Sequence, residues 1–139
     1  MRILLLSFLI ILALGCIPYS DTPLTDPGSQ PIDASVVGTW FWNDEHESGY
    51  IHIGLDDDSA LLRLFMMDFD RNEELEASEY SGHTSLLGGN TYLNIKWVRP
   101  EQKGITGYMV VKYTVRSDSL GIALMNFEVV KKAIQNGSI

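Results

Sequence analysis

The chain has 139 residues, with 10 lysines and arginines against 18 aspartates and glutamates, for a net charge of −8. Because an acidic surface is repelled by phosphate backbones, we expect no nucleic acid partner. The single cysteine excludes an internal disulfide, and the length allows one main hydrophobic core.

The first 15 residues have the pattern of a secretory signal peptide. Arg2 precedes the apolar run Ile3–Leu14, and the small residue Gly15 follows it. The run is shorter than the roughly 20 residues that a membrane-spanning helix needs. We therefore expect residues 1–15 to be removed on export, leaving nine basic and 18 acidic residues in the mature chain.

The stretch Ala13-Leu14-Gly15-Cys16 resembles the bacterial lipoprotein box, in which the cysteine becomes the lipidated first residue of the mature protein. The resemblance implies acylation with fatty chains such as palmitate at Cys16. Ile17, in place of aspartate, implies sorting to the outer membrane, with the protein facing the periplasm. The alternative is an ordinary secretory signal cleaved nearby, with Cys16 free or removed.

Residues 16–35 are predicted to be the lipidated cysteine followed by a flexible tether. Four prolines recur there among serine, threonine and aspartate, at Pro18, Pro23, Pro27 and Pro31. Such a composition buries too little apolar surface to fold alone, and its reach would be roughly 20–60 Å.

Residues 36–139 are predicted to form one mainly β domain. Apolar residues alternate with polar ones between short turn signals, over residues 36–42, 50–55, 60–69, 75–84, 91–98, 108–115 and 119–125. Seven such segments predict an antiparallel up-and-down barrel, with an open β-sandwich as the alternative. Asn126 is positioned to cap a short C-terminal helix over residues 127–135.

Gly38-Thr39-Trp40, at the start of the first long strand, resembles the glycine-any-tryptophan signature of lipocalin (calycin-type) barrels. The arrangement over residues 36–139 is similar to small lipocalin-like bacterial lipoproteins of uncharacterised function. The resemblance implies that Trp40 closes one end of a barrel against a basic residue from a late strand, for which Arg116 is the candidate.

Asp68–Glu79 is similar in spacing to an EF-hand calcium loop, with Asp68, Asp70, Asn72 and Glu79 at its ligating positions. The sixth position, where the loop needs glycine, is Glu73, and the flanks are strand-like. An acidic turn between two strands explains the same residues. The three histidines, His46, His52 and His83, lack paired ligand spacing. We therefore expect no metal and no cofactor.

No catalytic motif is evident, since neither Ser81 nor Ser85 lies in a nucleophile elbow, and we expect a protein that is not an enzyme. One hypothesis is a binding module whose barrel lining holds a small apolar or amphipathic ligand, with Trp40, Met66, Met109 and Met125 as lining candidates. The alternative is a structural or protein-interaction lipoprotein of the cell envelope with a filled barrel, using an outer face or a sheet edge.

Overall fold

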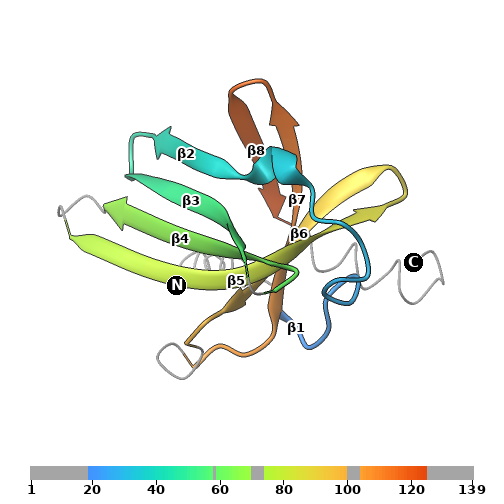
Figure 1. The fold of residues 1–139 in the computed structure, drawn as a ribbon. Coiled ribbons are helices and arrows are strands. Elements are labelled where there is room, and N and C mark those ends of the chain that lie inside the picture. The colour runs from blue at the N-terminus through green and yellow to red at the C-terminus, as the bar shows by residue number, and fades with distance from the viewer. Residues whose placement is uncertain (1–18, 58, 70–73, 100–103, 125–139) are drawn as a thin grey trace, which may run out of the picture.

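The computed structural model describes residues 19–57, 59–69, 74–99 and 104–124 (Figure 1). The predicted signal peptide, Cys16, Met125 and the predicted C-terminal helix lie outside these residues, as do Asp70 and Asn72. Within them the chain is mainly β, which confirms the predicted class, and its helical part is the 3-10 turn η1 (Ala34–Val36).

The strands are β1 (Tyr19–Ser20), β2 (Gly38–Asn43), β3 (Ser48–Asp56), β4 (Leu61–Phe69), β5 (Leu75–Leu87), β6 (Asn90–Trp97), β7 (Tyr108–Arg116) and β8 (Ser119–Leu124). The strands β2 to β8 match the seven segments expected from alternation. The short β1 is additional, because two residues carry no periodicity.

All strands belong to one antiparallel sheet, in the order β1-β7-β6-β5-β4-β3-β2, with β8 also paired to β7. β1 pairs with the start of β7 at Met109, and β8 pairs with its later part from Val111 onward. Tight turns keep consecutive strands adjacent. Gly88 and Gly89, with φ of 56° and 75°, form the two-residue turn between β5 and β6.

The sheet is not closed into a barrel within the described residues. β2 and β8 are its two long outer strands, and each pairs on one side only. Successive strands alternate in direction, so β2 and β8 run the same way. Closing this sheet directly would need a parallel ladder between them, and the described residues contain none.

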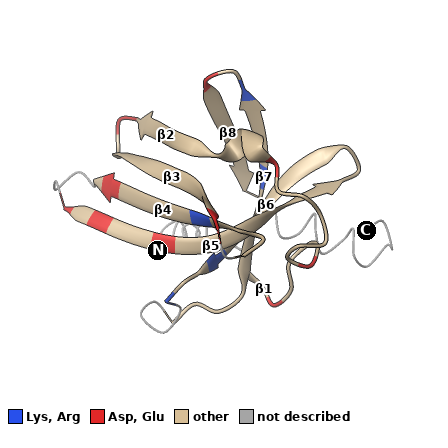
Figure 2. Ribbon diagram, in the orientation of Figure 1, with Lys and Arg blue, Asp and Glu red and all other residues tan. Residues whose placement is uncertain are grey.

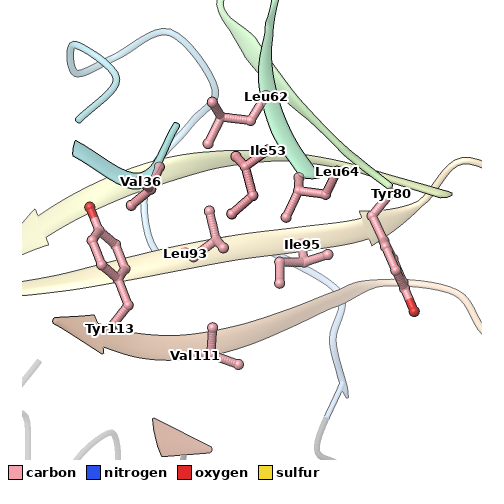
Figure 3. Close-up of a cluster of buried hydrophobic side chains, with 9 residues drawn as sticks. All are labelled: Val36, Ile53, Leu62, Leu64, Tyr80, Leu93, Ile95, Val111 and Tyr113. Atoms are coloured by element: carbon pink, nitrogen blue, oxygen red, sulfur yellow. The ribbon is translucent and has the colours of Figure 1, made fainter. Parts of the chain in front are cut away.

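The core lies on the inner face of the sheet, where side chains from η1 and from β3 to β7 meet (Figure 3). Its nine members are between 0% and 7% exposed: Val36, Ile53, Leu62, Leu64, Tyr80, Leu93, Ile95, Val111 and Tyr113. Each large apolar side chain buried in this way contributes roughly 1.5–3 kcal/mol. These nine side chains fill the middle of the interior and the end of it that η1 covers.

Residues 21–33, here called the strap, cross the outer face of β5 and β6 between β1 and η1 (Figure 1). The backbone N–H of Leu24 donates to Asn94 Oδ1 at 2.8 Å, and the carbonyl of Thr25 accepts from His83 Nε2 at 2.7 Å. This part of the chain differs from the flexible tether expected from its composition, because side chains of β5 and β6 supply the partners that a short polar segment cannot find within itself.

The strap ends at the η1 end of the sheet. Asp33 accepts a hydrogen bond from the core residue Tyr113 at 2.7 Å and caps η1 through the N–H of Ser35. Val36 then enters the core, and its carbonyl accepts from the indole N–H of Trp40 at 2.9 Å. The polar edge of Trp40 is thus directed to η1. Among the described residues, Arg116 is exposed and makes no cation–π contact with Trp40.

Candidate interaction surface

The outer face of β2 to β5 carries a continuous group of apolar side chains, here called the aromatic patch. Side chains alternate between the two faces of a strand, so residues next to inward-facing core positions must point outward. In this part of the sheet many of those outward positions are also apolar. The patch consists of Phe41, Tyr50, Phe65, Met67, Phe69 and Leu75.

Strand register brings the patch together. Phe41 lies opposite Tyr50, with ring centroids 5.9 Å apart, and Tyr50 lies opposite Met67. The hydroxyl of Tyr50 donates to Met67 Sδ at 2.7 Å, which links β3 and β4 in the middle of the patch. Phe41 is 79% exposed and Phe65 is 43% exposed. Exposed apolar side chains that lie together on one face are typical of an interaction site.

The patch reaches an unpaired strand edge. Phe41 belongs to β2, which pairs with β3 along one edge. Its other edge has no partner strand among the described residues. Such an edge presents free backbone N–H and C=O groups to another strand. A partner could therefore gain backbone hydrogen bonds along β2 and apolar contact on the patch together.

Acidic residues lie at the end of the patch that is formed by the β2–β3 turn and the start of β5 (Figure 2). Asp44, Glu45 and Glu47 lie in the β2–β3 turn, Glu74 comes directly before β5, and Glu76 lies in β5 on the inner face, opposite Asp68.

Arg63 is the basic residue of the described part of β2 to β5. It donates to Glu79 at 2.5 Å, and its Nε is 3.5 Å from Asp56. The hydrogen bond to Glu79 and the charge of Asp56 raise the pKa of the guanidinium. Arg63 is thus engaged by carboxylates, and the acidic end of the patch suits a partner with a positively charged surface.

A second feature lies on the inner face at the same end of β2 to β4. The ring of Trp42 packs over Gly49, where an added Cβ would lie 2.5 Å from the ring, and Gly49 pairs with Asp68. The indole N–H of Trp42 and Oδ1 of Asp68 are buried without a hydrogen-bond partner. A hollow of about 290 Å³ at this end of the sheet is lined by Asp68 and Glu76 from the inner face, by Phe69 and Leu75 of the aromatic patch, and by Glu47 and Glu74.

The residues expected to line a ligand cavity lie at the rim of the core. Trp40 and Met66 flank Ile51 on the inner face, and all three are partly buried. Met109 packs against the same core from β7. The structure therefore brings these expected residues to one face of the sheet, while Met125 lies outside the described residues.

The calcium-like spacing is divided by the sheet. Asp68 pairs with Glu76, whereas Glu79 pairs with Phe65, so Asp68 and Glu79 point to opposite faces. The described parts of the chain contain no group of three or more acidic, histidine or cysteine side chains placed for a metal ion. His52 bonds to Thr39 on the outer face, and His83 lies under the strap.

The sequence pattern did not predict the aromatic patch, although a signal for it exists. Apolar residues occur consecutively in Trp40-Phe41-Trp42 and in Leu64-Phe65-Met66-Met67, where a strand with one buried face should alternate. Such runs indicate that both faces of the strand are apolar. The strap gave no comparable signal, because its contacts are polar and distant in sequence.

No family model, no curated protein and no solved structure matches this chain. In the portion of the chain that the structure describes, no helix has the length and apolar character needed to cross a bilayer.

Proposed function

We propose that this protein is a lipid-anchored, non-catalytic protein of the bacterial cell envelope that binds another protein through the aromatic patch and the adjoining edge of β2. Its domain would be a lipocalin-like relative with about seven long strands. Lipidation of Cys16 would hold it at the outer membrane, facing the periplasm. This proposal favours the protein-interaction hypothesis over a ligand-filled barrel.

The exposure of the patch is the observation that carries the proposal. Phe41 is 79% exposed, although the domain already buries its nine core side chains to 7% exposure or less. The patch is therefore exposed in a domain that already has a buried apolar core. Aromatic and methionine side chains are also the residues enriched at protein interfaces.

The proposed lipid anchor is supported by the sequence before the domain. An apolar run followed by Gly15-Cys16 resembles the lipoprotein signal, and a lone cysteine has no internal disulfide to form. Two or more fatty chains would make the attachment effectively permanent. Intact mass of the protein extracted from host membranes should show acyl chains on Cys16. An unmodified or absent cysteine would remove the anchor from the proposal.

Photo-crosslinking in the native host tests the interaction. A photoreactive phenylalanine analogue at position 41 should crosslink to a defined envelope protein, whereas the same analogue at Lys112, an exposed position of β7, should not. Phe65→Ser should reduce the yield at position 41 by about tenfold, which is about 1.4 kcal/mol of binding. Equal yields at both positions, or yields unaffected by Phe65→Ser, would contradict the proposal.

A small amphipathic ligand is a second candidate, favoured by the unpartnered polar groups at Trp42 and Asp68. A ligand with both a donor and an acceptor could satisfy them, and the nearby hollow of about 290 Å³ would hold a small group. Mass spectrometry of compounds that co-purify with the protein tests this candidate. A compound lost in Asp68→Asn but kept in Phe41→Ser would support it, and the absence of any compound that depends on Asp68 would contradict it.

A further inference from the structure

The end of the sheet near β1 carries aromatic and basic side chains. Tyr19 pairs with Met109 and Ser20 with Tyr108, at the start of β7. Lys96 lies opposite Tyr108 on β6, with Nζ 5.4 Å from the centre of that ring. We name this region the basic end, and it comprises Tyr19, Lys96, Trp97, Val98, Arg99 and Tyr108.

The basic end lies close in sequence to the proposed lipid anchor. Tyr19, which is held in the sheet by β7, is three residues after Cys16. Even a fully extended chain covers only about 10 Å over three residues. The pairing of β1 therefore removes most of the roughly 20–60 Å of reach that a flexible tether would have.

β6 and β7 differ in charge from β2 to β5 (Figure 2). Glu79 of β5 borders the basic end, since its carbonyl accepts from the N–H of Val98, and its side chain is paired with Arg63. The described residues of β6, β7 and the ends of the loop between them contain Lys96, Arg99, Lys112 and Arg116, and no acidic residue. The acidic side chain next to β1 in sequence is Asp21. Anionic lipid headgroups attract lysine and arginine within about 10 Å and repel carboxylates.

The uncharged members of the basic end also suit a membrane surface. Tyr19, Trp97 and Tyr108 are half-buried, and Val98 is exposed. Trp97 stacks at 4.5 Å from Tyr80, so its ring is held in place at this end of the sheet. Tyrosine and tryptophan, with an apolar ring and a polar edge, favour the zone between headgroups and water.

We propose that the lipidated domain rests directly on the bilayer through the basic end. This inference depends on the lipid anchor of the proposed function. The acyl chains supply attachment, and the distribution of charge sets the orientation. The carboxylates of the β2–β3 turn and at the start of β5 would be repelled by anionic lipid.

Amine labelling on vesicles tests the orientation independently of natural acylation. Cys16 is the only cysteine, so the mature chain can be coupled there to a maleimide lipid in phosphatidylglycerol–phosphatidylethanolamine vesicles. Lys112 is a matched control, since it is exposed on the same face as Lys96 and about 13 Å further along β7. On vesicles the labelling rate of Lys96 should fall about fivefold relative to solution, while that of Lys112 should change less than about twofold.

Equal rates for the two lysines would overturn the docking proposal. As a second test, brominated lipids should quench tryptophan fluorescence less in Lys96→Glu/Arg99→Glu than in Lys112→Glu/Arg116→Glu, which makes the same change of charge at the other end of β7. Equal quenching in both variants would also contradict it. Because the anchor is added chemically, failure here leaves the lipidation proposal standing, and a host protein without acyl chains leaves this result unaffected.

Discussion

The outer face of the sheet has two regions in which burial and polarity are inverted. Under the strap, His83, Ser85 and Asn94 are polar yet only 3%, 2% and 0% exposed. On β2 to β5, Phe41 is apolar yet 79% exposed, and Phe65 is 43% exposed. Hydrophobicity alone predicts the opposite for each region.

The difference shows that a polar side chain on this face is buried where another segment offers it hydrogen-bond partners. Asn94 donates to Ser85 Oγ at 2.8 Å and accepts from the N–H of Leu24, so its polar groups are satisfied away from water. The strap covers β5 and β6, and no described segment covers the aromatic patch. We interpret the covered region as structural and the uncovered region as the surface left for a partner.

Asn94→Leu should have the largest effect on stability. The change leaves the N–H of Leu24 without its partner and removes one of the two hydrogen bonds of Ser85 Oγ, which keeps its bond to Thr25, and this should cost about 3 kcal/mol of unfolding free energy. Urea denaturation measures it. Asn43→Leu, at an exposed position of β2, should change stability by less than about 0.5 kcal/mol. Similar values for the two variants would mean that the strap does not bury Asn94 in solution.

Tyr113→Phe should have an intermediate effect, about 1 kcal/mol at neutral pH, because it removes the hydrogen bond to Asp33 that fastens the end of the strap. Urea denaturation at each pH measures it. Tyr92→Phe, which removes a hydroxyl from a half-buried tyrosine on the outer face, should change stability little at any pH.

The pH dependence of this contact follows from both groups. Burial and the bond to Asp33 raise the pKa of Tyr113 above 10.0, so its contribution is present below that pH and is lost as the pH rises above it. Burial acts to raise the pKa of Asp33, but bonds from Ser35 and Tyr113 outweigh it and lower the pKa below 3.8. The contribution of Asp33 to stability is therefore present above pH 3.8 and is lost as the pH falls below that value. Tyr113→Phe should flatten the alkaline loss, and an unchanged alkaline profile would contradict this account.

Phe41→Ser should have the smallest effect on stability, about 0.5 kcal/mol, although it changes an aromatic residue to a polar one within a strand. The reason is that this side chain is already in contact with water over 79% of its surface. Thermal unfolding of Phe41→Ser and Asn94→Leu under the same conditions gives the comparison. A cost equal to that of Asn94→Leu would show that Phe41 is packed in solution and that the patch is not a free surface.

The strands were predictable because each repeats a local pattern. Ile51, Ile53 and Leu55 alternate along β3, and Leu93, Ile95 and Trp97 along β6, so the inward set is readable from spacing alone. The aromatic patch was only partly readable. Runs such as Phe65-Met66-Met67 show that both faces are apolar, but they do not show which face stays uncovered.

Local spacing by itself determined the mainly β class, the seven long strands and their turns, because strand periodicity and turn chemistry act over a few residues. Tertiary structure alone decided that residues 21–33 lie on β5 and β6, that Asp68 and Glu79 point to opposite faces, and that β2 and β8 remain edges. Those outcomes depend on hydrogen bonds and registers between segments many residues apart. Thr25 and His83, for example, are 58 positions apart in the chain and 2.7 Å apart in the fold.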